Sequence, residues 1–236
     1  MSNRRWEQLG AAAGIVFVVV QVAANNLMEQ VGGNEPPSYA EAPEIVNFFM
    51  TRDSRLFGLG DYIMTLSVIP FVWWLSVLWA RLRRAEGKAG WLAVAALGFG
   101  LVSATELVSG GRWTLVMGRI EEGLDPELAR TLFDMGNLNF ANIWVSRAGI
   151  LIAAGILSIR TGALPKWLGW AGLVVALGLL IARAFWERSG VVFAPIAFFW
   201  LWMIMTSAVL IRRAGRPDGS AALRKNPDSA GINERG

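Results

Sequence analysis

Few residues of this sequence could carry chemistry in apolar surroundings, and Arg147 is the most conspicuous of them. It lies near the middle of an apolar run from Asn137 to Leu157. An arginine at the centre of a membrane-spanning helix costs roughly 2.5–3.5 kcal/mol, so it should face protein or trapped water and have a partner. Glu106 and Asp61 are carboxylates in comparable runs. We expect Arg147 to pair with Glu106 first, with Asp61 as a second acceptor.

Amide side chains in the same apolar runs extend this polar set. The candidate ligand-binding residues are Asp61, Glu106, Arg147, Asn142, Asn139, Asn25 and Gln21. Counted along the predicted helices, all seven fall between the midplane and the outer surface, so we expect their side chains to converge. Two interpretations stay open. The charges either line an outward-facing polar cavity, because intramembrane ionisable groups are candidate functional sites, or they form a structural clasp that fixes helix register.

The absence of both Cys and His limits the chemistry further. It excludes disulfides, thiol chemistry and metal or haem sites that use these ligands, and we predict neither a metal nor a cofactor. Proton chemistry would fall to carboxylates, Lys or Tyr. A carboxylate held beside an arginine stays ionised and is a poor proton donor, so an enzyme is the weaker hypothesis and we assign no catalytic residue.

The elements that must position these residues are membrane-spanning helices. Of the 236 residues, 54% are hydrophobic, and they gather in runs long enough to cross a bilayer. The predicted spans are approximately 11–28, 56–80, 91–111, 138–159, 167–185 and 191–211. The predicted fold is therefore an all-α, six-transmembrane-helix bundle over residues 1–213. The polar remainder, 214–236, is predicted to be a disordered cytoplasmic tail.

The loop charges predict the orientation. Lys and Arg crowd the N-terminus, the turns Arg81 to Lys88 and Arg160 to Lys166, and the segment after Ile211. Cytoplasmic loops carry such an excess, so we expect both termini to be cytoplasmic. No basic stripe with interleaved aromatics indicates nucleic-acid binding. The first run also fits a secretory signal, but a polar and small-residue face that includes Gly14 and Gln21 favours an uncleaved helix.

Two short amphipathic helices are predicted on the outer side, lying in the membrane interface. One follows Pro43, with Ile45, Phe48 and Phe49 on one face. The other begins at Pro126, capped by Asp125. Each opens with Pro-Glu, and each of the two basic turns is followed by Trp-Leu, which suggests an internal two-span repeat with an axis along the membrane normal. The alternative is that membrane hairpins of this composition look alike.

A small-residue face in the fifth span, made by Gly169, Gly172 and Ala176, indicates close helix packing. It would suit a membrane-protein partner or a homo-oligomer. The turn IRTGALPKWLGWAG at 159–172, together with RLRRAEG at 81–87, resembles a broad group of uncharacterised bacterial six-helix integral membrane proteins of unknown function. This resemblance implies the bacterial cytoplasmic membrane and supplies no site residues.

Three functions are compatible with this sequence. The first is binding or transport of a small polar or amphipathic ligand in the outward-facing cavity. The alternative is a non-catalytic structural or regulatory membrane subunit, for which the small-residue face and the interfacial helices would be the working surfaces. The second alternative is a membrane enzyme that uses Glu106 or Asp61 as acid or base beside Arg147.

Overall fold

The computed structural model describes residues 3–29, 36–37, 39–88, 90–109, 112–186 and 193–214, and within these ranges the chain is all-helical. The helices are α1 (Asn3–Glu29), α2 (Ala42–Met50), α3 (Ser54–Leu66), α4 (Val68–Glu86), α5 (Trp91–Val108), α6 (Arg112–Ile120), α7 (Pro126–Thr161), α8 (Lys166–Ala184) and α9 (Phe193–Ala214). Six helical stretches in the described residues are long and apolar enough to cross a membrane, which confirms the predicted multi-pass membrane class. The predicted tail lies almost wholly outside the described residues.

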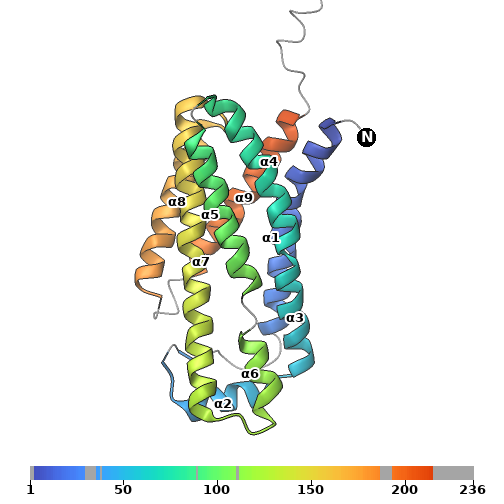
Figure 1. The fold of residues 1–236 in the computed structure, drawn as a ribbon, viewed down its shortest axis with the longest axis vertical. Coiled ribbons are helices and arrows are strands. Elements are labelled where there is room, and N and C mark those ends of the chain that lie inside the picture. The colour runs from blue at the N-terminus through green and yellow to red at the C-terminus, as the bar shows by residue number, and fades with distance from the viewer. Residues whose placement is uncertain are drawn as a thin grey trace, which may run out of the picture.

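Helix α7 forms the centre of the bundle. In its most apolar 18-residue window 72% of the residues are buried, against 28–39% for the other five spans. It packs on α5 and α8, while α1 packs on α3, α4 and α9 (Figure 1). A contiguous apolar core joins these helices, with Trp74, Trp144 and Phe199 among its largest fully buried side chains.

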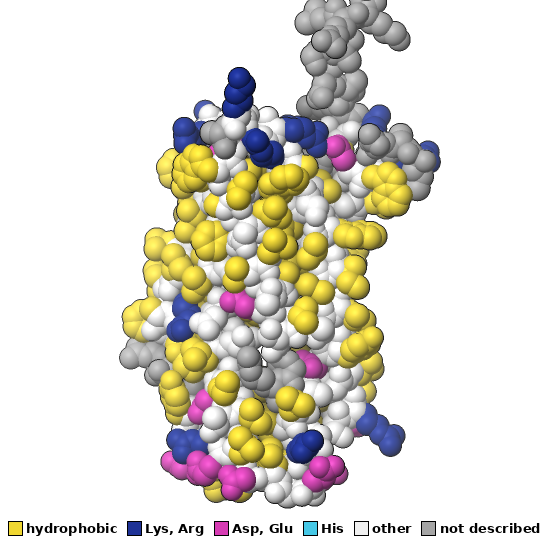
Figure 2. Space-filling model, viewed as in Figure 1, with side chains coloured by type: hydrophobic (Ala, Val, Ile, Leu, Met, Phe, Trp, Pro, Cys, Tyr) yellow, Lys and Arg dark blue, Asp and Glu magenta, His cyan; other side chains and the backbone are white. Residues whose placement is uncertain are grey.

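The surface of the bundle is apolar along its length and charged at its ends. On the face shown in Figure 2, hydrophobic side chains cover the middle, with isolated charged groups among them. Lys and Arg gather at the end that carries the N-terminus, and Asp and Glu gather with a few basic groups at the other end. We call the first the basic end and the second the cap end.

The second predicted span is interrupted near its middle. Helix α3 ends at Leu66 and α4 begins at Val68, so Ser67 separates them. Pro70 explains the break, because it has no N–H to donate to the Leu66 carbonyl. The hydroxyl of Ser67 turns back to donate to the Met64 carbonyl. Pro70 predicted an interruption of the helix at this position, and the structure confirms it. The break leaves Ser67 available as a polar partner inside the bundle.

A second hydrophobic core lies at the cap end. It joins α2, α6, the start of α3 and the first turns of α7, and Phe49, Phe57, Met117 and Phe133 are buried in it. We call this group of elements the cap. Its helices bury their apolar faces against one another, whereas the sequence suggested that such faces lie in the membrane interface. Helix α6 was not predicted as a separate element.

The helix that begins at Pro126 is not a separate interfacial helix. Asp125 caps it as predicted, accepting the backbone N–H groups of Glu127 and Leu128. It then continues for 36 residues, through the fourth span to Thr161. By contrast, the helix at Pro43 is nine residues long and separate from the span that follows. The two halves of the suggested repeat therefore differ in construction, and the repeat stays a prediction.

Candidate functional site

Arg147 is buried in the centre of the bundle. Its side chain is 2% exposed, and its guanidinium carbon lies 5.0 Å from the centre of the Phe199 ring on α9. No carboxylate of the described residues lies within 4.0 Å of it, and its Nε has no hydrogen-bond partner there. The direct ion pair expected with Glu106 is therefore not formed. The two charges still attract each other electrostatically across a longer distance.

Glu106 is half-buried on α5 and bonds to α7 instead. The Ser146 hydroxyl donates to its Oε2 at 2.6 Å, and the Asn139 amide donates to its backbone carbonyl at 3.4 Å. Ser146 was missed in the sequence. A signal was available, because Asn139, Asn142 and Ser146 are spaced i, i+3 and i+7 and therefore share one face of α7. This face positions the carboxylate of Glu106.

Asn142 belongs to a different pair, because its Oδ1 accepts a hydrogen bond from Arg183 Nε on α8 at 3.1 Å. Gln21 on α1 is 4% exposed and donates to the Ser67 hydroxyl at 2.7 Å. Asn25, one turn further along α1, is half-buried, and no hydrogen bond of its side chain is found within the described part of the chain. These contacts link helices pairwise.

Asp61 lies far from the other charges. Its Oδ2 accepts a hydrogen bond of 2.6 Å from the Thr114 hydroxyl on α6. Measured from the basic end at about 1.5 Å per residue, Asp61 is about 38 Å along α4 and α3, whereas Glu106 is about 22 Å along α5 and Arg147 about 21 Å along α7. The difference of about 17 Å between Asp61 and Arg147 exceeds the reach of any side chain. Asp61 therefore does not serve as the second acceptor for Arg147.

The seven predicted residues thus form separate contacts at different depths, and the described structure does not gather them around one cavity. Glu106 and Asn139 meet at the interface of α5 with α7, whereas Arg147 lies against Phe199 on α9 and is coupled to Glu106 only electrostatically. Asn142 turns toward α8, Gln21 toward the α3–α4 break, and Asp61 toward the cap. The described residues contain no group of three or more carboxylates placed to hold a metal ion.

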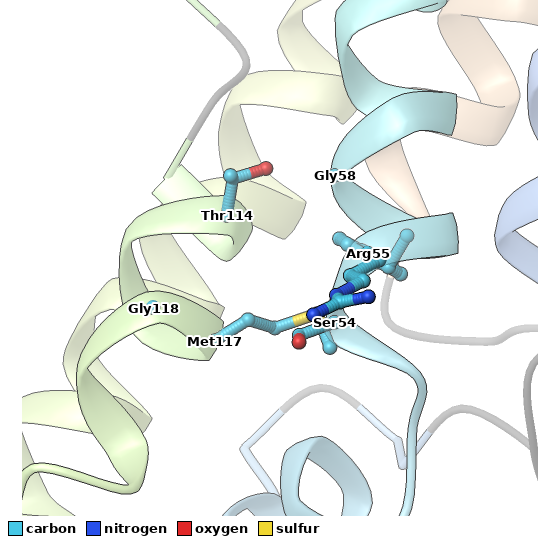
Figure 3. Close-up of a pocket in the computed structure, with 7 residues that line it drawn as sticks. Ser54, Arg55, Gly58, Thr114, Met117 and Gly118 are labelled. Carbon is cyan, nitrogen blue, oxygen red and sulfur yellow. The ribbon is translucent and has the colours of Figure 1, made fainter.

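A pocket does lie at the cap end, between the first turns of α3 and helix α6. Its volume is about 250 Å³, and it is lined by Ser54, Arg55, Phe57, Gly58, Thr114, Met117 and Gly118 (Figure 3). Met117 reaches from α6 toward Ser54 and Arg55 on α3. The hydrogen bond from Thr114 to Asp61 ties the two walls together. Among the predicted residues, only Asp61 is connected to this pocket.

Two glycines are among the residues that line the pocket. A Cβ atom placed on Gly58 or on Gly118 would meet no atom within 4 Å, so both positions have open space beside them. The pocket was not predicted, because its two walls are 50 or more residues apart in the chain and helix α6 was not expected.

The small-residue face of α8 is not free for a partner. Gly169 lies against the backbone of Gly155 on α7, and a Cβ on Gly169 would come within 2.9 Å of the Gly155 carbonyl oxygen. Gly172 packs against Trp202, whose Nε1 donates to the Leu168 carbonyl, and Ala176 is 1% exposed. This face mediates packing within the chain, and an oligomer or a membrane-protein partner stays a prediction.

Comparisons with models of known protein families, with curated proteins and with solved structures each found no match to this chain. The resemblance of the two basic turns to bacterial six-helix membrane proteins therefore gains no support. The function has to be inferred from the geometry of the site.

Proposed function

We propose that the protein binds a small polar or amphipathic ligand in the pocket between α3 and α6, on the outer side of a membrane. The observation that carries this proposal is the pocket of about 250 Å³ with a cation, a hydroxyl and apolar side chains in its wall. Ligand sites in proteins combine an apolar lining with a few polar groups in this way. Such binding is also the first step that transport from the outer side would need.

The orientation within this proposal comes from the charges. Arg81, Arg84 and Arg160 lie near the C-terminal ends of α4 and α7, which are at the basic end (Figure 1). The positive-inside rule makes that end cytoplasmic, so the cap and the pocket face outward and both termini lie in the cytoplasm. We extend the proposal to the cytoplasmic membrane of a bacterium, which is what the resemblance of the basic turns implies.

The deep polar residues have a structural role in this proposal. Glu106 is engaged by Ser146, and Gln21 by Ser67, so each contact fixes the register of one helix against the next. The same engagement argues against an enzyme that uses Glu106 or Asp61 as a base, since both carboxylates already accept a hydroxyl hydrogen bond. A subunit that docks through Gly169, Gly172 and Ala176 is not proposed, because that face is buried.

The test fills the pocket and follows ligand-dependent stability. Gly118 lines the pocket, and a Cβ atom added there meets nothing within 4 Å, so Gly118→Leu is chosen to fill the pocket. Leucine is also a better helix former than glycine, so the variant should fold. Gly98→Leu is the matched control, because Gly98 is an exposed glycine on α5 whose added Cβ also meets nothing. Both proteins and the wild type are purified in detergent and screened by thermal unfolding against polar and amphipathic metabolites.

A ligand present at about 100 times its dissociation constant stabilises the folded state by about 2.7 kcal/mol. For a chain of this size that corresponds to a rise in Tm of roughly 5–10 °C. We expect at least one compound to produce this rise in the wild type and in Gly98→Leu, and to lose its effect in Gly118→Leu. An equal rise in all three proteins would show that the ligand binds elsewhere, and would refute the proposed site.

A further inference from the structure

The pocket lies at the depth of the lipid head groups. Trp79 adjoins the basic turn, and the rise from Trp79 to Arg55 along α4 and α3 is about 36 Å. The hydrocarbon core of a bilayer is about 30 Å thick. With Trp79 at the inner boundary, Arg55 lies at the outer boundary of the hydrocarbon or up to about 6 Å beyond it, since the interruption at Ser67 and helix tilt shorten the rise. That is the zone of phosphates and other polar head groups.

Exposed apolar side chains continue from the pocket toward the bilayer. Leu59 follows Arg55 by one helical turn and is 48% exposed, and Tyr62 follows Gly58 by one turn and is 60% exposed. On α6, Leu115 adjoins Thr114 and is 62% exposed. The pocket thus adjoins a surface that suits acyl chains, so a molecule held at its mouth can keep its apolar part in the membrane.

Arg55 is the cation of the pocket, and it is available for a ligand. It is exposed, and no carboxylate in the described ranges lies within 4.0 Å of it. The nearby acidic groups are engaged. Asp53 caps α3 by accepting the backbone N–H groups of Arg55 and Leu56, and Asp61 accepts from Thr114. A guanidinium in this situation favours a phosphate or carboxylate, which it can bind through two parallel hydrogen bonds.

We infer that the ligand of this pocket is an amphiphile with an anionic head group, such as an anionic phospholipid. This inference rests on the proposed function and adds the class of ligand. Arg55 binds the phosphate of the head group, and the Ser54 and Thr114 hydroxyls lie within the same pocket. The tail lies along the exposed side chains of Leu59, Tyr62 and Leu115 beside the pocket. A volume of about 250 Å³ is below the usual range for a whole drug-sized ligand, so the pocket holds the head group while the tails stay in the bilayer.

The experiment uses the full chain in detergent micelles and measures binding by native mass spectrometry and by the shift in Tm. The probes are phosphatidylglycerol, which is anionic, phosphatidylcholine, which is zwitterionic, and soluble glycerol phosphate. The test variant is Arg55→Gln, which removes the charge and keeps the backbone cap. The matched control is Arg119→Gln, because Arg119 is an exposed arginine on α6 that does not line the pocket.

We expect phosphatidylglycerol to bind the wild type and Arg119→Gln, and to bind Arg55→Gln about tenfold more weakly, as the loss of a charge-assisted hydrogen bond implies. Phosphatidylcholine and glycerol phosphate should bind the wild type at least tenfold more weakly than phosphatidylglycerol. Equal binding of both phospholipids, or no effect of Arg55→Gln, overturns the inference. Binding of glycerol phosphate alone overturns it too, because the ligand is then a soluble phosphate compound.

The two proposals fail in different ways. If Gly118→Leu abolishes binding of a neutral ligand while Arg55→Gln has no effect, the pocket is the site and only the anionic class is wrong. If phosphatidylglycerol binds Gly118→Leu as well as it binds the wild type, the pocket is not the site and both proposals fail.

Discussion

Replacing Arg147 with methionine should leave the free energy of unfolding within about 1 kcal/mol of the wild type, even though this is one of the largest fully buried side chains. Moving a guanidinium out of water costs several kcal/mol. Two interactions offset this cost. The attraction to Glu106, which lies beyond 4.0 Å, is worth roughly 2–3 kcal/mol at 5–7 Å and an effective dielectric of 20. The cation–π contact with the Phe199 ring is worth up to about 2 kcal/mol. Cost and gain nearly cancel, and methionine fills much of the same volume.

Removing the charge of Glu106 should lower the free energy of unfolding more than removing the charge of Arg147. Glu106→Gln leaves Arg147 buried without its counter-charge, and the protein then loses the attraction of roughly 2–3 kcal/mol that offsets the cost of burying the guanidinium. Arg147→Met instead leaves a half-buried Glu106 that keeps its hydrogen bond from Ser146. The double variant should therefore recover most of the stability that Glu106→Gln loses, which a double-mutant cycle measures directly.

The assay is equilibrium unfolding of the purified protein in mixed micelles, followed by far-ultraviolet circular dichroism. The expected order places the wild type, Arg147→Met and the double variant close together and Glu106→Gln well below them. A loss of 3 kcal/mol or more in Arg147→Met, with Glu106→Gln unchanged, would refute this reasoning. Ligand binding at the cap end should be unaffected in Arg147→Met, because the pocket shares no residue with this cluster.

Two further changes test the packing that supports the site. Gly155→Ala should destabilise the protein by about 1–3 kcal/mol, because the new Cβ would come within 2.8 Å of the Gly169 carbonyl oxygen. The control is Gly178→Ala, whose Cβ meets only Pro195 at 3.7 Å and which should be neutral or stabilising in the same unfolding assay. Asp125→Ala removes the acceptor for two N–H groups at the start of α7 and should lower the free energy of unfolding by about 1 kcal/mol. Proteolysis near Pro126 should become faster. Unchanged stability and cleavage would mean that the hydrophobic core of the cap alone stabilises the start of α7.

The spans of this fold follow from the sequence because the bilayer imposes a simple constraint. A buried or lipid-facing backbone must satisfy its own hydrogen bonds, so long apolar runs form helices, and Pro70 interrupts one of them for a local reason. The start of α7 was equally local, since Asp125 and Pro126 specify a cap. Its continuation into the fourth span was not, because the row Leu124, Leu128 and Leu132 suits a protein core as well as a membrane surface.

The contacts of the polar residues were harder to predict, since depth along a helix is countable but rotation and tilt are not. Counting placed Glu106 and Arg147 at the same level, and in the structure the two charges are electrostatically coupled. Counting did not predict that Ser146 would donate a hydrogen bond to the Glu106 carboxylate or that the Phe199 ring would contact the Arg147 guanidinium. Asp61 was assigned to the wrong group because its true partner, Thr114, lies on a helix that the sequence did not suggest.

The length of α7 explains why the pocket lies at the cap and not within the bundle. At 1.5 Å per residue α7 is about 54 Å long, against about 30 Å of hydrocarbon. Within the bundle α7 is the most buried of the six spans, and its residues Asn139, Asn142 and Ser146 bond to the neighbouring helices α5 and α8. The remaining 24 Å or so carries Phe133 and its neighbours beyond the membrane, where α2 and α6 assemble on them. Helix α6 then meets α3 through Thr114 and Asp61, and two glycines in their facing surfaces leave a space that the packed bundle lacks. A variant that closes this space while leaving α7 intact therefore separates ligand binding from folding.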